Sequence, residues 1–264
     1  MTETKALLQK YEIVPNKALG QNFLVNAAVA DRIVKEATIE GKNVLEIGPG
    51  LGALTKRLAH TAKSVVAVEI DEKMANVIRN ELPAVTLIHE DFLDTDIDGL
   101  FDGERFSVAA NLPYYVTTPI SLKLLCCADR IDSMTLMLQK EAGQRFFEKE
   151  GSKKYGPLTV LAKRSCAIKK IADLSPSDYY PMPDVDSVVV HLECKKEVKD
   201  NQKMMHLLNC AFSMRRKTLV NNLMAMNLTR EEAENILEKA SLPKTVRAEA
   251  VDIDGFERLL SVLY

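Results

Sequence analysis

Short apolar runs alternate with stretches of helical apolar spacing between residues 41 and 194. The runs predict strands at residues 44–47, 65–70, 85–89, 106–110, 134–138, 166–174 and 187–193. The spacing between them predicts helices at residues 53–60 and 71–81, the second capped by Asp71. It also predicts a helix that Thr118 caps and that begins at Pro119, and one through Arg145 and Phe147. This alternation predicts an α/β fold, with an open, mostly parallel sheet covered by helices on both faces. The last two strands have no helix between them, which predicts an antiparallel edge.

The pattern changes at a charged stretch, residues 195–203. Beyond it the apolar spacing is helical only, and it predicts helices at residues 204–211, 217–226, 229–240 and 252–263. Thr229 and Glu232 have the spacing of a capping box at the start of the third of these helices. We therefore expect two domains, an α/β domain of residues 1–194 and a small all-helical domain of residues 195–264.

The N-terminal residues carry a different signal. A helical pattern at residues 5–11 is followed by the uncharged segment 19–24, which offers two amides and an aromatic ring. A disordered arm would offer charges instead, so this segment is expected to fold over another part of the protein. Asn26 is then expected to cap a helix.

The composition is that of an ordinary globular protein, with 47% hydrophobic and 27% charged residues. Asn111, Pro113 and Pro119 interrupt the longest uncharged run, so no membrane span is expected. The start of the chain lacks the pattern of a signal peptide, which predicts a cytoplasmic protein. Five cysteines without a Cys-x-x-Cys pair are expected to be reduced packing residues, and four scattered histidines predict no metal site.

The net charge of −2 does not indicate a protein that coats nucleic acid nonspecifically. Basic residues cluster locally, and the longest cluster, Arg215, Arg216 and Lys217, opens one of the C-terminal helices. Such a cluster is either a contact for phosphates or a solvated helix start. The sequence alone leaves both interpretations open.

A glycine loop joins the first predicted strand to its helix, in the order Glu46-Ile47-Gly48-Pro49-Gly50-Leu51-Gly52. Glycines there allow a tight turn and a close approach of a ligand to the backbone. Glu69 ends the second strand, where a carboxylate can accept hydrogen bonds from two ribose hydroxyls. Asp91, after the third strand, could accept from an adenine amine or simply cap a turn. These features predict a cofactor with an adenosine group, and a nicotinamide cofactor fits the loop as well.

The segment Asn111-Leu112-Pro113-Tyr114-Tyr115 follows the fourth predicted strand. By itself it could be a turn in which proline ends the strand. At the carboxyl end of a parallel strand, however, an amide, a backbone carbonyl and an aromatic ring also make a pocket for a flat base that carries an amine. The segment therefore indicates chemistry on adenine or cytosine.

Taken together, the motifs resemble the KsgA-type small-subunit ribosomal RNA adenine dimethyltransferases. The resemblance covers nearly the whole chain and keeps the order of the family's motifs. It rests on residues 17–24, 46–52, 69, 90–91, 111–114, 139–141, 155–158, 180–187 and 215–219.

This resemblance implies a Rossmann-like methyltransferase sheet, S-adenosylmethionine as the methyl donor, and two adjacent adenosines in the 3′-terminal hairpin loop of small-subunit ribosomal RNA as acceptors. The protein would act on the immature small subunit, as a monomer without a metal. The cofactor-binding residues that it implies are Asn22, Leu24, Gly48, Gly50, Glu69, Asp91 and Asn111.

The resemblance also implies roles at the target base. The side-chain oxygen of Asn111 and the carbonyl of Leu112 would accept the two N–H bonds of the adenine amine. Tyr114, with Tyr180 as a second candidate, would stack on the extruded base. Arg215, Arg216 and Lys217 would contact the RNA.

Three other functions compete with this interpretation. A nicotinamide-dependent oxidoreductase would use the same glycine loop but leaves residues 111–114 and 19–24 without a role. An assembly factor that has lost catalysis would not need Glu69, Asp91 and Asn111. The related large-subunit methyltransferases of the macrolide-resistance type share the catalytic domain, and residues 180–187 and 215–219 favour the small-subunit enzymes over them.

Overall fold

The computed structural model describes residues 3–264 and contains a seven-stranded sheet in the order β4-β3-β2-β5-β6-β9-β7. Its strands are β2 Asn43–Ile47, β3 Ser64–Glu69, β4 Thr86–His89, β5 Phe106–Asn111, β6 Ile131–Gln139, β7 Cys166–Leu174 and β9 Ser187–Cys194. The pairs among β4, β3, β2, β5 and β6 are parallel, and β9 runs antiparallel to both β6 and β7. The predicted mostly parallel sheet with antiparallel pairing at one edge is thereby confirmed. The structure adds that β9 lies between β6 and β7, so that β7 is the edge strand.

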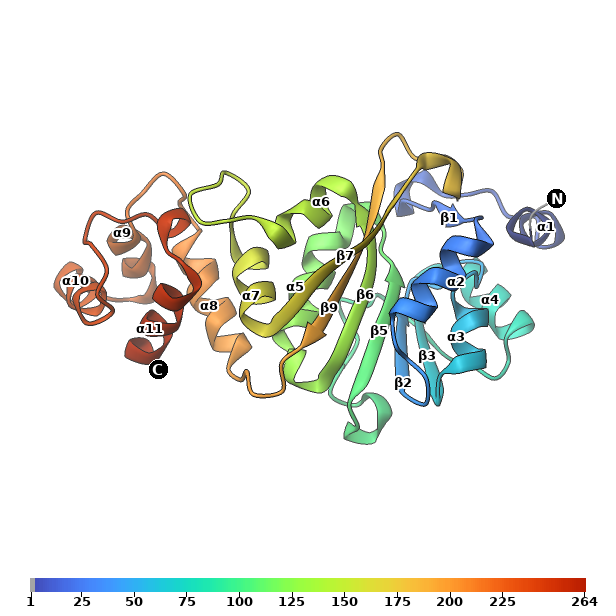
Figure 1. The fold of residues 1–264 in the computed structure, drawn as a ribbon, viewed down its shortest axis with the longest axis horizontal. Coiled ribbons are helices and arrows are strands. Elements are labelled where there is room, and N and C mark those ends of the chain that lie inside the picture. The colour runs from blue at the N-terminus through green and yellow to red at the C-terminus, as the bar shows by residue number, and fades with distance from the viewer. Residues whose placement is uncertain (1–2) are drawn as a thin grey trace.

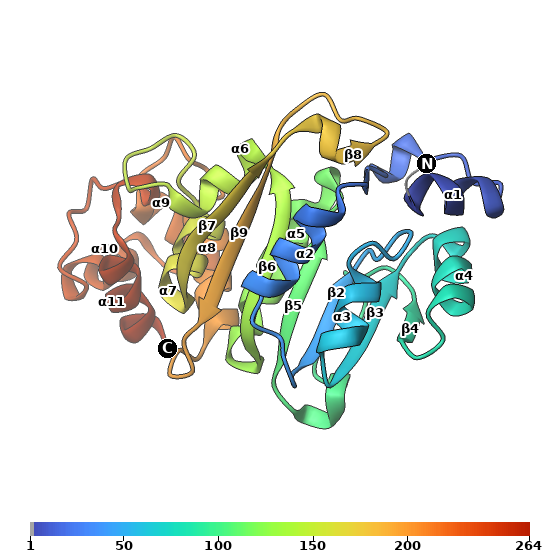
Figure 2. The same ribbon diagram turned by 45° about the vertical axis from the view of Figure 1, so that its right-hand side comes forward.

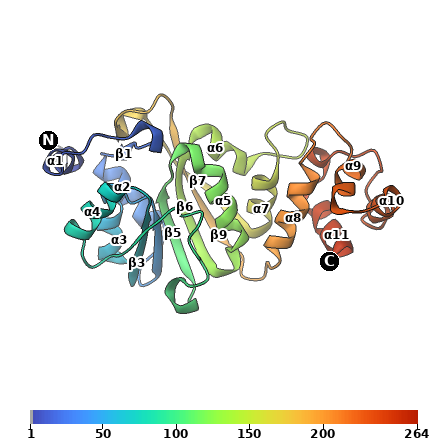
Figure 3. The same cartoon turned by 180° about the vertical axis from the view of Figure 1, so that it is seen from behind.

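Helices cover both faces of the sheet (Figures 1–3). On one face, α2 Ala27–Glu36, α3 Thr55–Thr61 and α4 Glu72–Glu81 enclose a core with alternate residues of the strands, such as Val44. On the other face, α5 Thr117–Cys126 and α7 Pro157–Ser165 pack on the strand residues in between, such as Leu45. Because strand side chains alternate between faces, strands buried on both sides are apolar throughout.

A small second sheet lies beyond the carboxyl ends of the parallel strands. Its strands β1 Phe23–Leu24 and β8 Tyr179–Tyr180 pair antiparallel, so the N-terminal segment meets a loop more than 150 residues later in the chain. The helix α1 Glu3–Lys10 lies next to α4, and Glu81 accepts bonds of 2.6 Å from both Lys10 and Tyr11. The prediction that residues 19–24 fold over another part of the protein is confirmed.

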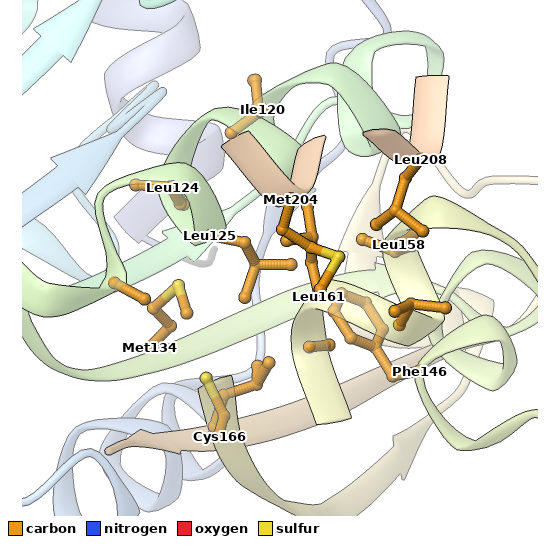
Figure 4. Close-up of a cluster of buried hydrophobic side chains, with 14 of the residues drawn as sticks. Ile120, Leu124, Leu125, Met134, Phe146, Leu158, Leu161, Cys166, Met204 and Leu208 are labelled. Carbon is orange, nitrogen blue, oxygen red and sulfur yellow. The ribbon is translucent and has the colours of Figure 1, made fainter. Parts of the chain in front are cut away.

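The C-terminal helices extend the molecule away from the N-terminus (Figure 1). They are α8 Asn201–Ala211, α9 Leu219–Leu223, α10 Arg230–Lys239 and α11 Ile253–Leu263. Met204 and Leu208 of α8 pack with Leu161 of α7 and Leu125 of α5 in one continuous hydrophobic core (Figure 4). These helices are therefore attached to the sheet domain through a shared hydrophobic core and not only through the connecting segment.

Several predicted helix caps are confirmed. The side chains of Asn26, Asp71 and Thr229 accept hydrogen bonds from backbone amides at the starts of α2, α4 and α10, and Glu232 completes the capping box. Each cap satisfies amides that have no partner within the helix.

Two local predictions need correction. The sequence does not predict α7, because seven of its nine residues are buried and a helix buried on all sides has no amphipathic period. Thr118 does not cap α5, which begins at Thr117 after a short 3₁₀ turn at Tyr114–Val116. There the hydroxyl of Thr117 donates back to the carbonyl of Pro113 at 3.1 Å, so the chain is already helical before Thr118.

Candidate active site

A pocket that is open to solvent lies at the carboxyl ends of β2, β3, β4 and β5. This is the edge of a parallel sheet at which open α/β proteins bind ligands. The predicted site residues that line it are Asn22, Leu24, Gly48, Gly50, Glu69, Asp91, Asn111, Leu112 and Tyr114. Within residues 3–264, the lining does not include Tyr180, Arg215, Arg216 or Lys217.

The glycine loop forms one wall of this pocket. Gly48 and Gly50 have φ angles of 65° and 55°, a backbone conformation that residues with a side chain rarely adopt. A Cβ atom on Gly50 would lie 3.1 Å from Cδ1 of Phe23, in the segment that covers the pocket. The glycines therefore permit both the turn and the close approach of the covering segment.

Glu69 lies at the end of β3 with its side chain turned back toward the glycine loop. Its Oε2 accepts from the amide of Gly50 at 3.1 Å and its Oε1 from the amide of Asp71 at 2.9 Å. Burial raises the pKa of this carboxyl, and the two amides oppose the shift. Each carboxylate oxygen can accept a second hydrogen bond, so Glu69 is oriented and can still bind a pair of hydroxyls.

Glu46 is a site residue that the sequence analysis did not assign. Glu46 is only 2% exposed, and its Oε2 has no hydrogen-bond partner among residues 3–264. Burial, together with the nearby Glu69, raises the pKa of Glu46 to about 8, and Thr55 opposes the shift. A charged residue inside the apolar run 44–47 was the signal that could have identified it, because unpaired buried carboxyls are costly.

Asp91 begins a tight turn after β4. Its Oδ1 accepts from the amide of Leu93 at 2.8 Å, and its carbonyl accepts from the amide of Asp94 at 2.9 Å. The side chain is partly exposed and lines the pocket. Asp91 thus shapes the turn, as the simpler interpretation expected, and it also presents a carboxylate to the pocket.

The position of Asn111 depends on a contact between distant segments. Its Nδ2 donates to the carbonyl of Asn22 at 3.1 Å, across 89 residues of sequence. Because the nitrogen is held in this way, the oxygen of the same amide is left to accept from a ligand. The amide of the next residue, Leu112, donates to the carbonyl of Met137 at 3.1 Å and holds the backbone of the segment against β6.

The two candidate aromatic residues, Tyr114 and Tyr180, and the neighbouring Tyr115 lie in different settings. The hydroxyl of Tyr114 shares a hydrogen bond of 2.8 Å with Oγ of Ser187, and burial raises the pKa of this phenol. Tyr115 is 55% exposed at the pocket mouth. Tyr180 lies outside the lining, with Nζ of Lys5 at 5.0 Å from its ring centroid. Tyr114 is therefore the tyrosine whose ring is held in place within the pocket.

The basic cluster in the C-terminal helices is divided by its contacts. Nη2 of Arg215 donates to the carbonyl of Tyr155 at 3.1 Å and lies 3.5 Å from a carboxylate oxygen of Glu249. Arg216 and Lys217 are exposed and form no ion pair within residues 3–264. Arg215 thus connects two parts of the protein, whereas the charges of its two neighbours face solvent.

Metal-ligand clusters and membrane-spanning helices are both absent from the part of the chain that the structure describes. Residues 3–264 contain no group of three or more His, Cys, Asp or Glu side chains arranged to hold a metal ion. None of the helices in this range is both long and apolar enough to cross a bilayer.

The fold and the site define a Rossmann-like methyltransferase. The solved structure of a dimethyladenosine transferase from Plasmodium falciparum is similar, with a TM-score of 0.74 and 26% identity over 90% of this chain and 95% of that one. The 23S rRNA methyltransferase ErmE shares the fold, with a TM-score of 0.63 and 24% identity over 92% of this chain and 99% of that one.

Sequence comparison gives the family. Residues 14–261 match the family described as ribosomal RNA adenine dimethylase. A ribosomal RNA small subunit methyltransferase A from Clostridium acetobutylicum is 41% identical over 99% of this chain and 98% of its own length, and one from Clostridium botulinum is 40% identical over the same shares. The chain belongs to the ribosomal RNA adenine dimethylase family. It is a ribosomal RNA adenine dimethyltransferase that uses S-adenosylmethionine, and the nicotinamide alternative is wrong.

Proposed function

We propose that this enzyme dimethylates N6 of two adjacent adenosines in the 3′-terminal hairpin loop of small-subunit ribosomal RNA, as a step in maturation of the small subunit. The clostridial relatives, which match over nearly their whole length, are named as small-subunit enzymes. Residues 180–187 and 215–219 support the same choice over the large-subunit group. We further propose that residues 1–194 carry catalysis, that residues 195–264 contact the RNA, and that the protein acts as a cytoplasmic monomer.

The charged side chains of the pocket support S-adenosylmethionine as its ligand. Its side chains include a buried carboxyl, Glu46, with one oxygen that lacks a partner, next to an oriented carboxylate, Glu69. A cationic ligand would supply the missing counter-charge, because an opposite charge favours the ionised carboxylate. In this proposal Glu69 holds the ribose, Asp91 accepts from the adenine amine, and Gly48 and Gly50 border the cofactor, while Asn22 and Leu24 close over it.

When bound, S-adenosylmethionine supplies an electrophilic methyl group. The role of the protein is to present the target amine. This amine is a poor nucleophile, because its lone pair is delocalised into the adenine ring. Asn111 Oδ1 and the Leu112 carbonyl accept its two N–H bonds, which helps to localise the pair on nitrogen. No strong base is needed, because the proton can be lost after the methyl group has moved. Positioning then contributes most of the acceleration, an effect that reaches roughly 7 to 11 kcal/mol.

The single observation that carries this mechanism is the bond from Asn111 Nδ2 to the carbonyl of Asn22. It supports a fixed orientation in which the amide oxygen faces the substrate. It also supports a link between cofactor and catalysis, since the segment that covers the cofactor is the one that orients the catalytic amide.

Tyr114 is proposed to stack on the extruded adenine. Its bond to Ser187 supports this role, because a ring held at its hydroxyl loses little further freedom when a base stacks on it. Such stacking contributes about 1 to 3 kcal/mol per base. Tyr180 lies outside the pocket lining. We therefore propose that it contacts a neighbouring nucleotide of the RNA rather than the target base.

The test is methyl transfer from labelled S-adenosylmethionine to purified small subunits that lack the modification, with large subunits as the matched control. We expect the label in the small-subunit RNA and a primer-extension stop at two adjacent adenosines near its 3′ end. Label in the large-subunit RNA alone would contradict the proposal and would favour the macrolide-resistance type of activity.

A further inference from the structure

Lys123 makes a contact that none of the roles above uses. Its Nζ donates three hydrogen bonds to backbone carbonyls, those of Phe92 at 2.8 Å, Leu93 at 2.7 Å and Thr95 at 2.7 Å. These bonds use all three donors of an ammonium group. Within residues 3–264, Lys123 forms no ion pair with a carboxylate. The side chain is therefore committed to one backbone turn.

That turn contains Asp91, a proposed cofactor-binding residue. It begins at Asp91, whose Oδ1 accepts from the amide of Leu93 and whose carbonyl accepts from the amide of Asp94. Phe92 is 4% exposed and lines the cofactor pocket, and its ring centroid lies 5.2 Å from Nζ of Lys123. The direction of the Asp91 carboxylate thus depends on a turn whose carbonyls converge on a single cation.

The other end of the contact is the catalytic segment. Lys123 lies on α5, which starts at Thr117, and only Val116 separates this helix from the segment of Asn111 to Tyr115. The base of this helix is anchored, because the hydroxyl of Thr117 donates to the carbonyl of Pro113. The ammonium group therefore connects the helix that follows the target-base segment to the turn that faces the cofactor.

Water could not replace this contact in the same geometry. Three carbonyls that point at one centre repel one another, and a cation with three donors relieves that repulsion while it holds them together. A water molecule has two donors and no charge. Removal of the ammonium would therefore allow the turn to relax, and the Asp91 carboxylate would move with it.

We propose that Lys123 is a positioning residue that holds the Asp91 turn in the geometry that recognises the cofactor's adenine. The inference rests on the proposed function, in which Asp91 accepts from the adenine amine. Lys123 does not touch the cofactor in this account. It acts through the turn, and its effect is specific to the adenine end of the ligand.

The experiment compares two product analogues by isothermal titration. S-adenosylhomocysteine carries the adenine amine, and S-inosylhomocysteine has an oxygen in its place. The wild-type protein is expected to prefer the former. In Lys123→Met, which keeps the length of the side chain without its charge, the affinity for S-adenosylhomocysteine should fall by about tenfold, the value of roughly one hydrogen bond. The affinity for S-inosylhomocysteine should change less, so the preference should shrink.

The matched control is Lys239→Met, which removes an exposed lysine from the last turn of α10. It should leave both affinities and the preference unchanged. A preference in Lys123→Met equal to that of the wild type would overturn the proposal. If Lys123→Met does not fold, Lys123→Arg decides, since a planar guanidinium cannot reproduce the three-bond geometry; an unchanged preference in that variant overturns the proposal as well.

Asp91→Asn separates the inference from the function on which it rests. If Asp91 has the proposed role, this variant alone should lose the preference for the adenine compound, and adding Lys123→Met should then have no further effect on the preference. An unchanged preference in Asp91→Asn would contradict the role of Asp91. A changed preference in Asp91→Asn with none in Lys123→Met would contradict the positioning role alone.

Discussion

Two groups of buried polar side chains lie in opposite parts of the protein, and they differ in how completely they are bonded. At the carboxyl edge of the sheet, Glu46 and Glu69 are at most 6% exposed, and Glu46 Oε2 has no hydrogen-bond partner among residues 3–264. At the junction with the C-terminal helices, Arg164 and Asn201 are also buried.

The second group is fully bonded. Arg164 donates to Glu257 at 2.8 Å, to the carbonyl of Lys199 at 2.8 Å and to the side chain of Asn201. Asn201 in turn donates to the carbonyl of Leu125 at 2.7 Å and to Ser165 at 2.9 Å.

For these two groups the difference corresponds to a site and a scaffold, although single buried atoms of Ser121, Arg130 and Asn222, which lie outside the pocket lining, also lack a partner among residues 3–264. Buried polar groups normally find partners within the protein, because an unmade hydrogen bond is costly. The junction follows this rule, and its bonds connect the C-terminal helices to the sheet. The carboxyl edge does not follow this rule. The unused hydrogen-bonding capacity of its carboxylates is available to a charged ligand that carries hydroxyl groups. The comparison predicts that changes at the edge affect ligands and that changes at the junction affect folding.

The largest effect is expected from Asn111→Ala. Loss of an oriented acceptor at the reacting amine should lower kcat by about 10²- to 10³-fold. The dissociation constant of S-adenosylmethionine should stay within about tenfold of the wild type, because the proposed main partner of Asn111 is the target base. Single-turnover kinetics and calorimetry measure the two quantities. Asn76→Ala, an exposed change on α4, is the control, and normal turnover in Asn111→Ala would refute the assigned role.

Arg164→Ala should act in the opposite way. It leaves Asn201 and the half-exposed Glu257 without their main donor, so the free energy of unfolding should fall by about 2 to 3 kcal/mol. The affinity of the folded protein for S-adenosylmethionine should not change. Urea unfolding provides the measurement, with Arg230→Ala as the control, because its exposed ion pair with Glu234 contributes less than about 1 kcal/mol. Equal stability of the two variants would break the comparison.

The third prediction concerns pH. In the free protein the pKa of Glu46 is raised to about 8, and a bound cation should lower it. Binding then releases a proton, so affinity for S-adenosylmethionine should rise with pH up to about 8 and level off above it, by at most about tenfold per pH unit. Calorimetry in buffers of different ionisation enthalpy detects the released proton. Glu46→Gln should flatten the profile, and a flat profile in the wild type would rule out Glu46 as the counter-charge.

Glu46 should also influence the stability of the free protein, with a definite sign. Its pKa is higher in the folded than in the unfolded chain, so the folded state binds more protons between about pH 4.5 and pH 8. The contribution of this group to stability therefore decreases as pH rises through that window. At pH 9, Glu46→Gln should raise the melting temperature of the free protein, whereas at pH 4 it should have little effect. A lower melting temperature at pH 9 would contradict the unpaired state of the carboxyl.

The smallest effects are expected in the basic cluster. Replacing Arg215, Arg216 and Lys217 together by alanine should weaken RNA binding and flatten its salt dependence. The single changes should differ: Arg216→Ala and Lys217→Ala should each reduce the slope of log K against log salt by about one without changing stability. Arg215→Ala should instead lower the free energy of unfolding by about 1 kcal/mol, since the hydrogen bond to the carbonyl of Tyr155 is lost. Unchanged RNA affinity at every salt concentration would refute the contact.

The sequence determined much of the fold by itself, because periodicity is a local property. Apolar runs placed six of the seven strands of the large sheet close to their observed bounds, and the caps Asn26, Asp71 and Thr229 are where the sequence predicts them. The remaining strand, β6, was placed as well, although it begins earlier, at Ile131. A helix such as α7, buried on all sides, carries no such period and was missed.

For the pocket, the sequence determined which residues gather at one edge. Glu69, Asp91 and Asn111 each stand at the end of a parallel strand or just after it, and such ends meet at one edge of the sheet. Tertiary structure alone decided how they are bonded. The orientation of Asn111 by Asn22, the free oxygen of Glu46 and the engagement of Arg215 depend on partners distant in sequence, and a local pattern contains no information about such partners.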